Sequence, residues 1–269
     1  MPMLTNIFWA GVLAALMMAL WDCQQWPRQT EAAWRRFRWV ALAVVAVAAG
    51  FFLINLLRYG SGETQQLITG ALRLTSVAVA SSVFFCGGWV WVSRAGHVGL
   101  FERVRRRVGG LRTPSPWLAV LETLAIAAGI IFVSYALFQI THAEPSAAFQ
   151  KWRTSRREFD IQSGYAVLMV LLAPFWEESA FRWYLLNRLE ERLAGRSWAR
   201  LAAIVMTSAF WACGHAELTN PVWIKLVQIF VVGCVLAWRF RTIGLSGCVL
   251  AHLAMNLTPA FSLTWAWRM

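Results

Sequence analysis

The sequence predicts an all-α integral membrane protein, a bundle of about eight transmembrane helices whose functional site lies inside the C-terminal half. Of its 269 residues, 59% are hydrophobic and 14% are charged, whereas about 25% of the residues in soluble domains are charged. Apolar runs long enough to cross about 30 Å of hydrocarbon follow one another along the chain. One of these runs contains two adjacent carboxylates, and ionised groups at membrane depth are rare and usually functional.

Each apolar run is expected to form one spanning helix. Tryptophans lie at the ends of many runs, as is typical of side chains at a membrane interface. No small-residue cleavage pattern follows the first run, so we expect it to remain as a span. The runs fall near residues 3–21, 38–57, 71–92, 117–140, 163–186, 198–215, 222–238 and 245–265.

The formal net charge of +12 comes from arginines that cluster between the apolar runs. This distribution predicts contact with the lipid bilayer and its anionic headgroups, and it argues against nucleic acid as a partner. Residues 94–112 resemble a basic amphipathic helix lying on the membrane surface, and residues 145–160 resemble a second, more mixed one. The five cysteines form no CxxC motif, which argues against a thiolate metal site.

The stretch TPSP, residues 113–116, is the clearest break in the chain. It divides an N-terminal membrane-spanning region with the basic interfacial segment, residues 1–116, from a core, residues 117–269. The unusual polar residues lie in that core, within 174–256.

The first polar cluster is Glu177, Glu178 and Arg182. Glu178 and Arg182 are four residues apart, so they meet on one face of a helix and can shield one another from lipid as an ion pair. Glu177 points about 100° away around the helix and has no local partner, which suits a general acid or base. The alternative is a salt bridge that only fixes helix packing.

Two further clusters follow on later helices. His215 ends the sixth run, and His252 and Asn256 share one face of the last run. Taken singly, each could be a hydrogen-bonding residue between helices. Glu, His, His and Asn converging from three helices are more typical of a catalytic site.

These motifs, EExxxR, then aromatic-xxx-His, then HxxxN, resemble those of the CPBP family, the CAAX proteases and bacteriocin-processing enzymes, over residues 163–260. Any one motif is weak, but three in this order are specific. The chain has Trp211 where the family usually has Phe. The first 160 residues resemble no family and are candidates for substrate specificity.

The resemblance implies an intramembrane endopeptidase of the glutamic type. Glu177 with His215 would activate a water, and His252 with Asn256 would donate hydrogen bonds to the oxyanion. Glu178, Arg182 and Trp211 would support them. No feature makes Ser179 a nucleophile.

The family was formerly described as metalloproteases, and two histidines with two carboxylates could bind zinc. Because the chain has no HExxH motif, hydrolysis without a metal or other cofactor is favoured. The substrate would be a membrane-anchored protein or peptide, and the resemblance implies a multi-pass protein of the bacterial inner membrane. Two alternatives stay open: a non-catalytic bacteriocin-immunity or peptide-binding member, and a proton-coupled transporter, which the missing inverted repeat disfavours.

Overall fold

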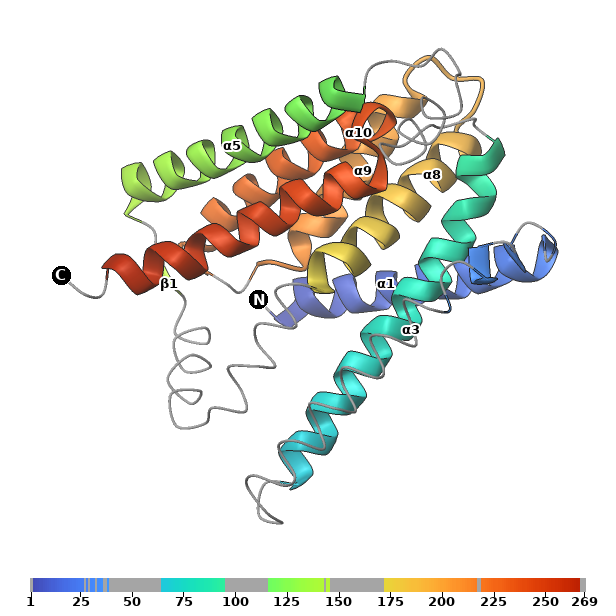
Figure 1. The fold of residues 1–269 in the computed structure, drawn as a ribbon, viewed down its shortest axis with the longest axis horizontal. Coiled ribbons are helices and arrows are strands. Elements are labelled where there is room, and N and C mark those ends of the chain that lie inside the picture. Colours follow the sequence, from blue (N-terminus) through green and yellow to red (C-terminus); the bar gives the residue numbers. More distant parts are fainter. Residues whose placement is uncertain are drawn as a thin grey trace.

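The structure is a computed structural model (Figure 1). It describes residues 2–26, 28, 30–31, 33–35, 38, 64–94, 116–142, 144–145, 172–216 and 219–266. Several predicted features lie wholly or mostly outside these residues: the span near 38–57, the basic segments 94–112 and 145–160, the break at 113–116 and the first part of the run 163–186.

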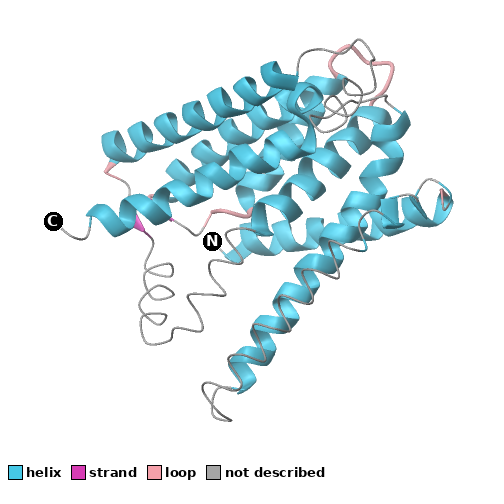
Figure 2. Ribbon diagram, viewed as in Figure 1, coloured by secondary structure: helices cyan, strands magenta, loops and turns pink. Residues whose placement is uncertain are grey.

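Helix accounts for nearly all of the described chain, which confirms the all-α prediction (Figure 2). One pair of two-residue strands, β1 and β2, is antiparallel, with Glu144 opposite Asn220. The elements are α1 (Pro2–Gln25), α3 (Thr64–Arg94), α5 (Pro116–Thr141), β1 (Glu144–Pro145), the π-helix η2 (Ser179–Leu185), α8 (Leu186–Arg192), α9 (Ala199–Cys213), β2 (Thr219–Asn220) and α10 (Val222–Ala266).

The helices α5, α9 and α10 run side by side, and α1 crosses beneath them (Figure 1). The C-terminal half of α3 packs against the bundle, whereas its N-terminal half extends away from it (Figure 1). The π-helix η2 contacts α1 and α3 as well as α9 and α10. The segment that directly follows the two glutamates is therefore enclosed by helices from both halves of the chain.

Three described helices are long and apolar enough to cross a membrane, namely Ile7–Gln25, Trp117–Thr141 and Val222–Leu257. Two shorter apolar helices, Thr75–Val90 and Ala199–Cys213, coincide with the third and sixth predicted runs. Large apolar side chains on α5, such as Leu121 and Phe132, point away from the core, as expected for a face in contact with lipid. The protein is thus an α-helical membrane bundle, and the number of eight spans stays a prediction.

The helix α10 is broken at Gly244, where φ is 67° and ψ is −175°. Glycine alone adopts this conformation without strain. The break separates two arms, which confirms the two runs predicted near 222–238 and 245–265. Across it, the Cys248 thiol lies 3.6 Å from the Leu236 carbonyl as a hydrogen-bond donor. The second arm, which carries His252, therefore folds back along the first.

Replacing Gly244 with alanine should lower the free energy of unfolding by about 1–3 kcal/mol, because a Cβ strains this backbone conformation. Thermal unfolding of the purified protein in one detergent measures the effect. The control is Gly129→Ala in α5, where an added Cβ meets no atom within 4 Å. That control should be neutral or stabilising by up to about 1 kcal/mol. Equal melting of the two variants would contradict a special role for the Gly244 conformation.

Candidate active site

The glutamates lie at the junction of two kinds of helix. Residues 172–178 are α-helical, and the π-helix η2 begins immediately after Glu178. In η2 the hydrogen-bond step is longer, and the Leu186 N–H donates to the carbonyl of Phe181, five residues earlier. The apolar run 163–186 predicts an ordinary helix here, and no feature of the sequence indicates a π-helix. Such π-helical turns are rare and are often found at functional sites.

The side chain of Asn187 binds the backbone at the point where the π-helix returns to an α-helix. The amide nitrogen of Asn187 donates to the carbonyls of Arg182, at 3.1 Å, and of Trp183, at 2.8 Å. Asn187 is itself buried, so these bonds satisfy polar groups that water does not reach. The winding of η2 is thus fixed at its C-terminal end.

Glu178 is the buried carboxylate of the pair, with a side chain 0% exposed. Its Oε1 accepts a hydrogen bond from Arg182 Nη1 at 3.2 Å, as the spacing predicted. The same oxygen lies 2.9 Å from His252 Nδ1, a contact that the sequence did not predict. Because a buried charge must be compensated, Glu178 fixes Arg182 and His252 relative to each other.

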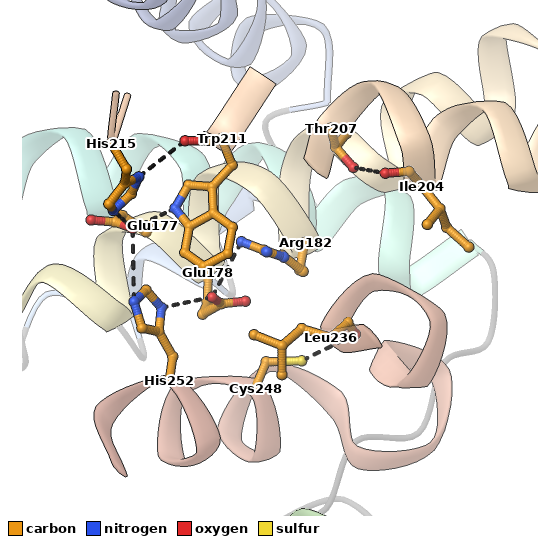
Figure 3. A network of polar contacts seen from close by, with 10 residues as sticks. All are labelled: Glu177, Glu178, Arg182, Ile204, Thr207, Trp211, His215, Leu236, Cys248 and His252. Carbon is orange, nitrogen blue, oxygen red and sulfur yellow. Dashed lines mark hydrogen bonds and ion pairs between the residues drawn. The ribbon is translucent and has the colours of Figure 1, made fainter. Parts of the chain in front are cut away.

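Glu177 faces the other side and keeps 13% of its side chain exposed. The indole Nε1 of Trp211 donates to Glu177 Oε2 at 2.5 Å. The same oxygen lies 3.8 Å from His215 Nε2 and 3.9 Å from His252 Nε2. The structure therefore brings together Glu177, His215 and His252, as predicted, and places them on three separate segments (Figure 3).

The partners of the two imidazoles determine which ring nitrogen carries the proton. His215 Nδ1 lies 3.1 Å from the carbonyl of Trp211, which only accepts, so Nδ1 is the donor. His252 Nδ1 likewise donates to the carboxylate of Glu178. Both Nε2 atoms are consequently the ones directed at Glu177 (Figure 3).

Trp211 lies at the centre of the site and is fully buried. Its ring packs edge-on against His215 and His252, with centroids 5.3 and 5.1 Å away. The guanidinium of Arg182 lies 4.1 Å from the ring centroid, in cation–π contact. A phenylalanine could provide the same packing, but only the indole can donate a hydrogen bond to Glu177.

Asn256 is the remaining residue of the predicted site, whereas Ser179 is not expected to act in it. Asn256 lies one turn after His252 on the second arm of α10, partly exposed, and makes no hydrogen bond to another described residue. Its role stays a prediction. The hydroxyl of Ser179 is buried without a hydrogen-bond partner, so no base is placed to activate it.

One charged residue near the site was missed. Lys225, on the first arm of α10, donates to Gln228 Oε1 at 2.8 Å and lies 5.7 Å from the ring centroid of Phe138. Its ammonium interacts electrostatically with both Glu177 and His215. The sequence feature that could have identified it is a lysine inside an apolar run, since the chain has only two lysines.

Within the described residues, no group of three or more His, Cys, Asp or Glu side chains is arranged to hold a metal ion. His252 Nδ1 and Glu178 Oε1 are bound to each other. Hydrolysis without a metal ion stays a prediction.

Residues 161–258, just over a third of the chain, match the model of a family described as Type II CAAX prenyl endopeptidase Rce1-like. The match confirms the predicted resemblance to the CAAX protease-like family for this part of the chain, and it contains all the residues of the candidate site. Comparison of the chain with curated proteins and with solved structures gives no match.

Removing Arg182 should be strongly destabilising, because it leaves the buried Glu178 carboxylate without its cation. Arg182→Ala is expected to lower the free energy of unfolding by about 3–5 kcal/mol. The double variant Glu178→Gln, Arg182→Met removes both charges at similar volume and should recover part of that loss. Thermal unfolding compares the two proteins. A double variant that melts no higher than Arg182→Ala would show that charge compensation is not what the pair provides.

Proposed function

Because residues 161–258 match the model of the Type II CAAX prenyl endopeptidase Rce1-like family, we propose that this protein is an intramembrane endopeptidase. It hydrolyses a peptide bond of a membrane-associated protein or peptide with a water molecule activated by Glu177 and His215. The observation that supports this most is the difference between the two carboxylates. Glu178 is 0% exposed and bound to a cation, whereas Glu177 is 13% exposed and faces two imidazole nitrogens.

The distances suit a water molecule held between two acceptors. The Glu177 carboxylate accepts hydrogen bonds, and so does His215 Nε2, because the proton of that ring is on Nδ1. At 3.8 Å apart, the two atoms are too far for a strong direct hydrogen bond. One water can donate a proton to each, which leaves its lone pair directed at a substrate carbonyl. As the water attacks, its proton passes to this pair.

His252 and Asn256 are the proposed donors to the oxyanion. His252 Nδ1 donates to Glu178, so Nε2 can donate to the substrate only when the ring carries both protons. Asn256, on the same face of α10, supplies a second donor from its amide. Each such donor lowers the barrier by about 3 kcal/mol in enzymes where one was removed.

The supporting residues hold this arrangement. Glu178 and Arg182 fix the position of His252, and the Trp211 indole orients the Glu177 carboxylate. We propose hydrolysis without a metal ion. The substrate is a membrane-anchored protein or peptide, and the enzyme is a multi-pass protein of the bacterial inner membrane.

Two other functions are distinguishable by experiment. A non-catalytic peptide-binding or immunity protein would keep the same helices but need no general base. A proton-coupled transporter would move substrate through a path containing Glu177. The mutual geometry of Glu177 with two histidines favours hydrolysis over both.

Glu177→Gln should abolish cleavage in a protein that still accumulates, because the amide keeps the shape but accepts no proton. We expect at least about a 100-fold loss, as for other general bases. The measurement compares the protein termini in membranes of cells that contain wild type or the variant at equal levels. Glu122→Gln is the control, since the partners of Glu122 are Arg239 and Thr242, neither of which belongs to the proposed site.

Termini that are present with wild type and Glu122→Gln and absent with Glu177→Gln would support proteolysis. Equal termini in all three strains would contradict it. Uptake of a solute into liposomes that Glu177→Gln abolishes would favour transport instead.

A further inference from the structure

A second buried carboxylate, Asp22, lies on α1, far outside the residues that match the family. Its side chain is about 1% exposed. Asp22 follows an apolar run and reads as the polar end of a span. A carboxylate so completely removed from water must be compensated by donors or cations. The residues that bind the Asp22 carboxylate therefore indicate its role.

Both partners shown for Asp22 come from the catalytic segment. The hydroxyl of Tyr184, in η2, donates to Asp22 Oδ2 at 2.9 Å. The Nε of Arg188, on α8, lies 3.2 Å from the same oxygen as an ion pair. Tyr184 and Arg188 stand on either side of the point where the π-helix returns to an α-helix. Asp22 thus binds both ends of that transition.

Trp183, the residue before Tyr184, is held by α3, the second N-terminal helix. The Trp183 indole nitrogen donates to the Phe85 carbonyl of α3 at 2.8 Å. Gly88 of α3 permits this approach, because a Cβ there would lie 2.2 Å from a Trp183 ring atom and 2.6 Å from the Trp183 carbonyl oxygen. Two consecutive residues of η2 are therefore fixed by two different N-terminal helices.

The residue immediately before these two is Arg182, which binds Glu178. Its carbonyl accepts from Asn187, so its backbone is held in the π-helical turn. If that turn rewound to an ordinary α-helix, the side chains before and after it would rotate relative to each other by about 100°. Glu178, before the turn, and Arg188, after it, could then not both keep their present partners, His252 and Asp22.

We propose that Asp22 is a positioning residue of the active site, which maintains the π-helical turn of η2 through Tyr184 and Arg188. The N-terminal helices α1 and α3 are accordingly part of the catalytic unit. The consequence for cleavage rests on the proposed function, whereas the effect on η2 does not.

The test uses the full-length protein in one detergent and three variants: Asp22→Asn, Tyr184→Phe and the double variant. Hydrogen–deuterium exchange is followed in peptides that cover residues 179–192. Loss of a buried hydrogen bond to a charged group should speed local exchange there by about tenfold or more. Asp22→Asn removes the ion pair with Arg188 and weakens the bond from Tyr184, so the effects of the two single changes should not add in the double variant. Tyr184→Phe keeps the ion pair with Arg188 and serves if Asp22→Asn folds poorly.

Glu122→Gln is a matched control. Glu122 also receives one arginine, Arg239, and one hydroxyl, Thr242, and also ties one helix to another. It should speed exchange near its own partners and leave residues 179–192 unchanged. Exchange at 179–192 that is unaltered in the Asp22 and Tyr184 variants, or that rises equally in Glu122→Gln, would overturn the proposal.

Cleavage is measured separately on the same variants. If η2 exchange rises and cleavage falls in turnover rate with unchanged substrate KM, Asp22 acts by positioning the catalytic groups. If η2 exchange rises but no variant, nor the wild type, cleaves any membrane protein, the proposed function fails while the role of Asp22 in η2 stands.

Discussion

The structure depends on the compensation of one buried charge, the carboxylate of Glu178. A carboxylate with no exposed surface is tolerated only where cations and donors surround it. Here a single oxygen binds Arg182 from η2 and His252 from the second arm of α10. This requirement brings together segments 74 residues apart in the sequence. It also fixes the orientation of the His252 ring, and with it the direction of the nitrogen that faces Glu177.

The same constraint separates the roles of two adjacent, chemically identical residues. Because Glu178 is buried, the adjacent Glu177 lies on the partly exposed side of the helix. There it is surrounded by Trp211 and the two imidazoles. The two side chains are chemically identical, so the roles proposed for them differ only because their surroundings differ. The indole of Trp211 both packs against the two imidazoles and donates a hydrogen bond to the Glu177 carboxylate.

Much of the site could be predicted from the sequence because its parts are local. The four-residue spacings predicted the Glu178–Arg182 pair and the common face of His252 and Asn256. The predicted runs 222–238 and 245–265 lie on either side of the break at Gly244. Other features depend on tertiary contacts. The π-helical winding of η2, the bond from Trp211 to Glu177 and the contact of Asp22 with Tyr184 arise only when distant helices pack. No spacing along the chain encodes them.

The most direct test of the difference between the two glutamates compares the unfolding midpoints of Glu177→Gln and Glu178→Gln, purified in the same detergent. Both changes keep side-chain shape and remove one charge. We expect a midpoint near wild type for Glu177→Gln, because that carboxylate retains access to water. For Glu178→Gln we expect a fall of several degrees, on the order of 6 °C or more, because Arg182 is left buried without its anion. Equal falls in both variants, or a larger fall for Glu177→Gln, would show that compensation of the Glu178 charge does not hold the structure together.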